Sequence, residues 1–149
     1  RAEIRLTTRQ PMDTTSDGVP FRRVGHLMFV MTTCNNRTTG YGLVDTGAAF
    51  SAVATGDAGR VNGPAAPEGV PLRGVMGNVG EAVRLSPVRF EMAGTGAKLV
   101  DREPLAMDLE ALSTANGLPV TAVIGYPALQ NSTLVVDYRA GTIRISEGK

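Results

Sequence analysis

The sequence predicts an all-β domain that spans residues 1–149 and has one short helix near its C-terminus. Two observations indicate this fold class. The chain contains 18 glycines and 9 prolines, which separate short runs of Val, Ile, Leu and Thr, as turns separate strands in β proteins. The length of 149 residues suits one domain with a buried core and is too short for a second full domain.

The expected strands are short apolar runs, and several alternate apolar and polar residues as a half-buried strand does. They cover residues 1–8, 23–33, 40–45, 48–53, 88–92, 97–100, 120–124, 134–137 and 142–146. Residues 35–36, 94–96 and 139–141 have the composition of hairpin turns between consecutive strands. Residues 10–20 and 55–69 are expected to be loops on the surface.

Three regions between these strands have a different character. Residues 72–85, LRGVMGNVGEAVRL, predict a mobile hairpin because glycine recurs through its centre. Residues 127–131 begin with proline, which favours the first turn of a helix, so they are expected to form the short helix. A single helical turn is also expected within residues 107–116.

The charge balance excludes several classes of function. The chain has 15 basic and 14 acidic residues, a net charge of +1, and neither sign forms a long block. We therefore expect no nucleic-acid or membrane-surface partner. The longest apolar run, residues 27–31, is too short to cross a bilayer. We expect a soluble protein, and the sequence leaves its compartment open between the cytoplasm, the periplasm and secretion.

Common cofactor and nucleophile motifs do not occur in the sequence. GVMGNVG at residues 74–80 lacks the glycine spacing of a dinucleotide-binding turn, and GTGAK at residues 94–98 lacks that of a P-loop. Ser51 does not stand in a G-x-S-x-G turn. Cys34 and His26 are the only cysteine and histidine, which excludes an internal disulfide and a cysteine-based zinc cluster. We therefore expect neither a metal nor an organic cofactor.

One acidic turn interrupts two apolar stretches in GYGLVDTGAAFSAV, residues 40–53. Aspartate is unfavourable in strands and costly to bury without partners. Asp45 is therefore either satisfied by nearby backbone donors or kept for chemistry. Gly47, which has no Cβ atom, lets backbone amides approach and hydrogen-bond the carboxylate.

The order of motifs along the chain resembles that of the retropepsin-like aspartic peptidases, and most closely their bacterial single-domain members. The resemblance rests on LVDTGA at residues 43–48, on VIG at residues 123–125, on the glycine-rich hairpin between them and on the ending VVDYRAGTIRI. It covers about residues 25–145, most of the chain. It implies a closed acid-protease barrel of the retropepsin type and hydrolysis of peptide bonds in a polypeptide substrate.

The resemblance also implies a role for each residue of the motif. Asp45 would be the acid and base, and Thr46 and Gly47 would hold it in place. Because the sequence has one Asp-Thr-Gly turn, the second carboxylate would come from Asp45 of another copy, in a homodimer. Ala48 would line the substrate cleft, and the hairpin would form a flap over the substrate. The predicted flap residues that contact substrate are Val75, Met76, Gly77 and Asn78.

Several alternatives stay open from the sequence. One is a catalytically silent module that keeps the fold and binds peptides or dimerises without cutting, and another is a domain whose partner supplies the other acid. After Gly125 many bacterial relatives have Asp and an apolar pair, whereas this chain has Tyr126-Pro127-Ala128. The terminal stretches AEIRL and TIRIS either interleave between protomers, as in the resembling family, or pair within one chain.

Overall fold

The computed structural model describes residues 18–62, 69–74 and 77–147. The strands are β1 (Val19–Pro20), β2 (Arg22–Val24), β3 (Leu27–Cys34), β4 (Thr38–Val44), β5 (Ala52–Ala54), β6 (Gly69–Gly74), β7 (Gly77–Arg84), β8 (Val88–Met92), β9 (Lys98–Asp101), β10 (Leu105–Met107), β11 (Val120–Ile124), β12 (Ser132–Asp137) and β13 (Thr142–Glu147). The helices are α1 (Thr55–Asn62), α2 (Glu110–Asn116) and α3 (Tyr126–Leu129). The predicted strand over residues 1–8 lies outside the described residues.

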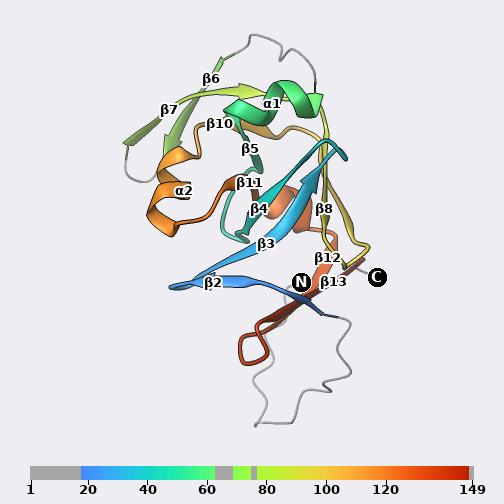
Figure 1. The fold of residues 1–149 in the computed structure, drawn as a ribbon. Coiled ribbons are helices and arrows are strands. Elements are labelled where there is room, and N and C mark those ends of the chain that lie inside the picture. The colour runs from blue at the N-terminus through green and yellow to red at the C-terminus, as the bar shows by residue number, and fades with distance from the viewer. Residues whose placement is uncertain (1–17, 63–68, 75–76, 148–149) are drawn as a thin grey trace.

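The strands form one large and one small sheet (Figure 1). The large sheet has the order β6-β7-β10-β5-β11-β4-β3-β8-β9, with β2 paired to β3, and the small sheet has the order β1-β13-β12. Within the described residues the large sheet is open, because no pairing joins β6 to β9. The predominance of β structure is therefore confirmed, and closure into a barrel stays a prediction.

The first hairpin shows both a correct and a wrong expectation. Asn35 and Asn36 turn the chain between β3 and β4 with positive φ angles of 48° and 56°, as their composition predicted. The single strand expected over residues 23–33 is wrong. Gly25, with φ of 59°, breaks it, and β2 folds back antiparallel on β3. Glycine adopts this left-handed conformation without a steric penalty, which a count of apolar residues does not reveal.

The described residues contain more helical structure than the sequence predicted. Helix α3 is confirmed, with Pro127 in its first turn, and α2 extends the single turn expected in residues 107–116 to seven residues. Helix α1 replaces the first part of the loop expected over residues 55–69. It forms despite two glycines because Ala58 and Val61 bury one face against the sheet. Tertiary burial of this kind outweighs a low intrinsic helix propensity.

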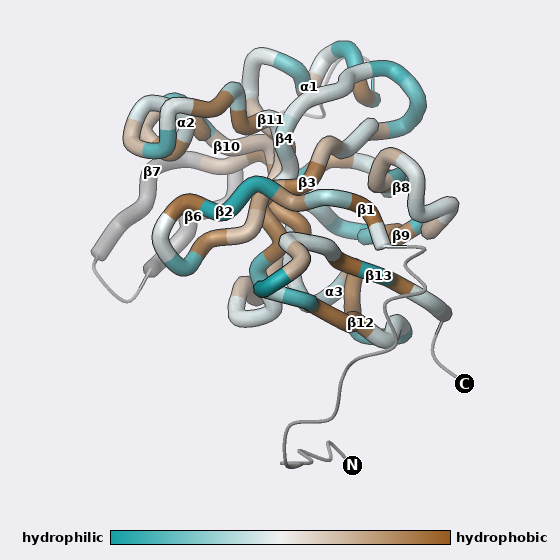
Figure 2. The backbone as a smooth tube through the Cα atoms, turned by 60° about the horizontal axis from the view of Figure 1, so that its bottom comes forward, coloured by the Kyte–Doolittle hydropathy of each residue, from teal (hydrophilic) through white to brown (hydrophobic). Residues whose placement is uncertain are grey.

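The core lies along the middle of the large sheet. Figure 2 shows hydrophobic residues gathered in β3 and its neighbours, whereas the peripheral turns are hydrophilic. The main cluster joins Val30, Phe90 and Met92 to Ile124, and a second cluster under α2 includes Phe29. Helix α2 therefore covers an apolar surface that the main cluster leaves uncovered.

The C-terminal hairpin lies in the small sheet. Strand β13 pairs along its length with β12 and at Thr142 and Ile143 with β1 of the same chain. The stretch TIRIS therefore pairs within one chain in this structure, and AEIRL lies outside the described residues.

Within the described ranges, no helix has the length and apolar character that a membrane span requires.

Candidate active site

Asp45 follows directly after β4, at the centre of the large sheet. Strand β4 runs parallel to β11, with Val44 opposite Ile124. The backbone N–H of Asp45 donates to the carbonyl oxygen of Ile124 at 3.0 Å. The position of Asp45 is therefore set by two central strands, and its backbone is held independently of its side chain.

The Asp-Thr-Gly turn supplies a hydrogen-bond donor to one of the two carboxylate oxygens of Asp45. The backbone N–H of Gly47 donates to Oδ1 of Asp45 at 2.9 Å, and the N–H of Ala48 donates to the Asp45 carbonyl at 3.2 Å. Among the residues that the structure describes, Gly47 is the only donor to this carboxylate, and no ion pair involves it. Asp45 is half-buried, and Thr46 and Gly47 are exposed. One carboxylate oxygen therefore remains available for a further proton or water.

Gly125 brings a second loop against the turn. A Cβ atom on Gly125 would lie 2.1 Å from the carbonyl oxygen of Phe50, so glycine is required there by the close approach of two backbones. The backbone N–H of Tyr126 also donates to the carbonyl of Ala48 at 2.9 Å. The residues after β4 and after β11 therefore form one packed unit, and this contact explains the VIG motif physically.

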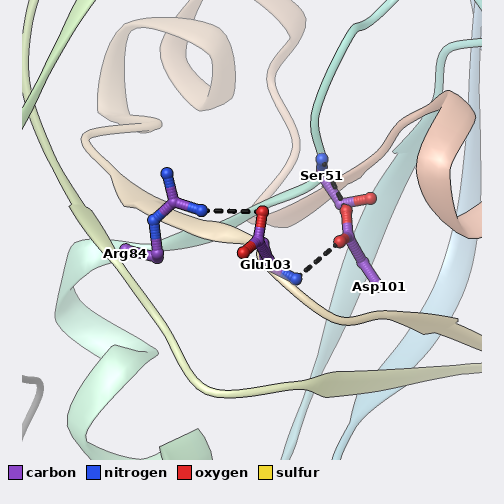
Figure 3. A network of polar contacts seen from close by, with 4 residues as sticks. All are labelled: Ser51, Arg84, Asp101 and Glu103. Atoms are coloured by element: carbon purple, nitrogen blue, oxygen red, sulfur yellow. Dashed lines mark hydrogen bonds and ion pairs between the residues drawn. The ribbon is translucent and has the colours of Figure 1, made fainter.

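A buried polar network fixes the end of the same loop (Figure 3). Ser51 is completely buried, and its Oγ accepts from the N–H of Gly125 at 3.1 Å. Its own N–H donates to Oδ2 of Asp101 at 3.1 Å, and the N–H of Glu103 donates to Oδ1 of Asp101 at 2.9 Å. Asp101 is only 4% exposed. Each of its carboxylate oxygens therefore has a charge-assisted hydrogen bond, which offsets the cost of burial.

The sequence reasoning missed Asp101. The sequence offers one sign that Asp101 is special. It directly follows the apolar pair Leu99–Val100, just as Asp45 directly follows Leu43–Val44. The bond from the N–H of Glu103 is a local one, two residues along the chain. No local pattern shows that the other partner of Asp101 is Ser51, which lies 50 residues earlier in the sequence.

The expected flap region is a hairpin in the structure. Strands β6 and β7 pair antiparallel, with Gly74 opposite Gly77, and β7 also pairs with β10. Val75 and Met76 lie outside the described residues, whereas Gly77 and Asn78 begin β7. The hairpin projects from the body of the sheet in Figure 1. Whether its tip covers Asp45 stays a prediction.

Several solved structures are similar to this chain, and two of them illustrate the similarity. The EIAV protease complexed with the inhibitor HBY-793 has a TM-score of 0.51 and 25% sequence identity, over 77% of this chain and 98% of that chain. A retropepsin-like aspartic protease from Rickettsia conorii has a TM-score of 0.54 and 16% identity, over 87% of this chain and 86% of that one. The chain has a retropepsin-like fold. No protein-family model and no curated protein matches the sequence.

The loop after β11 carries Tyr126, the residue at which the sequence departs from the pattern of the resembling family. Tyr126 opens α3, and its side chain is 55% exposed next to the packed unit of Ala48 and Gly125. The structure therefore accommodates the departure from the expected pattern without burying a tyrosine.

The thiol of Cys34 is not suited to act as a nucleophile. Cys34 is buried at the end of β3, and burial, reinforced by the negative charge of Asp57, raises its pKa to about 12. A thiol with such a pKa is protonated and unreactive near neutral pH. Within residues 18–62, 69–74 and 77–147, no group of three or more His, Cys, Asp or Glu residues could hold a metal ion.

Proposed function

We propose that this protein is an aspartic endopeptidase whose active site forms across a homodimer, with one Asp45 carboxylate from each protomer. The observation that carries the proposal is the state of Asp45. Its carboxylate is half-buried in an Asp-Thr-Gly turn at the centre of a retropepsin-like fold, and among the described residues only Gly47 donates to it. The other carboxylate oxygen is open to a proton or a water molecule, as a group that acts as acid and base requires.

The chemistry follows from placing two such carboxylates together. Two carboxylates within about 3 Å share one proton, because both cannot ionise comfortably at that distance. The ionised carboxylate takes a proton from the water held between them, and this water attacks the peptide carbonyl carbon. The protonated carboxylate donates its proton to the carbonyl oxygen. The carboxylate that took up the water proton then gives it to the departing nitrogen, a hydroxyl of the tetrahedral intermediate returns a proton to the other carboxylate, and the C–N bond breaks to release the amine. No covalent bond to the protein forms.

The neighbouring residues of the turn have supporting roles in this proposal. Thr46, which is exposed, would reach the equivalent residue of a second protomer and brace the pair. Gly47 supplies the N–H that orients the Asp45 carboxylate. Ala48, together with Val75, Met76, Gly77 and Asn78, would contact an extended polypeptide substrate through its backbone. Closure of the hairpin over the substrate would exclude bulk water from the reaction.

The test is proteolysis of an unstructured protein between about pH 4 and 6, where a dyad with one proton is populated. We expect cleavage that a statine-type inhibitor blocks. Asp45→Asn should reduce kcat by at least about a hundredfold, because it removes the general acid and base. Asp108→Asn is the matched control, since Asp108 is exposed and its carboxylate likewise accepts from a nearby N–H.

Two outcomes would contradict the proposal. Peptide binding without turnover would indicate the silent module instead. Cleavage that survives Asp45→Asn would show that another group performs the chemistry.

A further inference from the structure

A groove of about 980 Å³ opens beside the proposed active site. Its lining includes Ala49 and Phe50, the connection between β9 and β10, and residues 127–132 near α3. Ala49 follows Asp45 by four residues, so the two Cα atoms are at most about 14 Å apart. The groove therefore begins within reach of a peptide that lies over Asp45.

The charged side chains of this groove leave an excess of positive charge. Asp101 is buried, and both of its oxygens accept backbone N–H groups, so it offers no free oxygen to a ligand although its carboxylate keeps its negative charge. Glu103 pairs with Arg84 at 2.8 Å (Figure 3). Lys98 and Arg102 are exposed and complete the charged lining. The three cations and two carboxylates of the lining together carry a net charge of +1, and among the described residues Lys98 and Arg102 are the two cations of the groove without an acidic partner.

We propose that the groove binds an acidic segment of the polypeptide substrate, within about six residues of the scissile bond. This inference rests on the proposed function and extends it to the class of substrate. An extended peptide advances about 3.3 Å per residue, so at most about four residues span the distance from Asp45 to the nearest part of the groove. The two-fold axis of a homodimer would place one copy of the groove at each end of the peptide.

The charge and polarity of the groove favour acidic side chains over other ligands. Arg102 offers planar donors that match a carboxylate in two-point geometry, and Lys98 offers a point charge. The amide side chains of Gln130 and Asn131 add neutral hydrogen-bonding groups to the lining. Because these contacts are solvent-exposed, each ion pair is expected to change affinity by about two- to fivefold, and the effect should weaken strongly in about 1 M salt.

The experiment compares two labelled peptides with the same apolar centre, one flanked at both ends by glutamates and the other by lysines. We expect the wild-type protein to favour the glutamate-flanked peptide by about three- to tenfold in kcat/KM at low salt. The double variant Lys98→Glu/Arg102→Glu should abolish or reverse this preference. The double variant Arg37→Glu/Arg89→Glu changes the net charge equally at exposed positions outside the groove, and it should keep the preference.

Binding of the same peptides to Asp45→Asn, measured by fluorescence anisotropy, separates this inference from the proposed function. A preference for glutamates in binding, without turnover by the wild-type protein, would support the groove and refute the peptidase. Turnover with equal binding of both peptides would support the peptidase and overturn the groove. An equal loss of preference in the groove and control variants would also overturn it, because the preference would then come from net charge alone.

Discussion

The loop from Asp45 to Ser51 has two ends with opposite surroundings. At its beginning, Thr46 and Gly47 are exposed, and the N–H of Gly47 donates only to the neighbouring Asp45 side chain. At its end, Ser51 is completely buried and is hydrogen-bonded to Gly125, Asp101 and the N–H of Leu105. The comparison teaches that the loop is held at the Asp45 backbone and at the buried Ser51, so that Thr46 and Gly47 between them stay exposed without the turn losing its position.

The largest expected change in stability comes from a substitution that disrupts the packing at the buried end of the loop. Gly125→Ala would place a Cβ atom 2.1 Å from the carbonyl oxygen of Phe50, and neither backbone can move without disturbing the Asp45 turn. We expect a loss of more than about 3 kcal/mol in the free energy of unfolding, measured by urea denaturation.

Gly59→Ala is the matched control for that variant. Gly59 lies within α1, and a Cβ atom there would meet nothing within 4 Å. We expect it to stabilise the protein by about 0.5–1 kcal/mol, because alanine favours the helix and restricts the unfolded chain. Equal stability of the two alanine variants would contradict the close approach of the two loops.

A smaller change in stability is expected when the charge of Asp101 is removed from the network that it forms with Ser51 and Glu103. Asp101→Asn keeps the shape of the side chain but turns one of its two acceptors into a donor that faces the N–H of Ser51 or Glu103. We expect a loss of about 1–3 kcal/mol in the free energy of unfolding. Asp108→Asn should change it by less than about 0.5 kcal/mol, because Asp108 is exposed and the side-chain oxygen of asparagine can accept the N–H of Glu110 in its place. Similar losses in both variants would show that Asp101 is no special anchor.

The acidic end of the loop is largely readable from the sequence, and the buried end is not. A carboxylate between two apolar strands, with a glycine two positions later, has a local physical meaning that alternation and turn chemistry supply. The hairpin turn at Asn35–Asn36 and the short helix after Gly125 are predictable for the same reason. Each of these features is determined by residues within one turn of the chain.

The features that the sequence did not reveal all depend on distant contacts. The local composition of α1 favours a loop, but a helix forms because Ala58 and Val61 are buried against the sheet. The role of Asp101 depends on Ser51, which lies on another segment of the chain. The break at Gly25 requires knowing that β2 folds back onto β3. Such partners are set by topology, which no local pattern encodes.

The last effect is a dependence of stability on pH, and it tests whether the Cys34 thiol is shielded from water. Burial raises the pKa of Cys34 from its ordinary value of 9.0 to about 12. Between these values the unfolded chain releases a proton that the folded chain keeps, so the free energy of unfolding should fall as pH rises. The expected slope is up to about 1.4 kcal/mol per pH unit, and the effect is absent below about pH 8.

Cys34→Ala provides the comparison for this measurement, because it removes the titrating group. Urea denaturation at several pH values from about 8 to 11 should show a steeper fall for the wild-type protein than for the variant. Parallel curves would mean that the Cys34 thiol is accessible to water in the folded state.

The central claim is that one Asp45 carboxylate per protomer becomes half of a shared pair. The most direct measurement refolds mixtures of wild-type and Asp45→Asn chains at a constant total concentration and records peptidase activity against the wild-type fraction. If both carboxylates are needed, activity follows the square of that fraction, so an equal mixture retains about a quarter of the full activity. A linear dependence, with about half of the activity in the equal mixture, would show that each chain acts alone and would contradict the account.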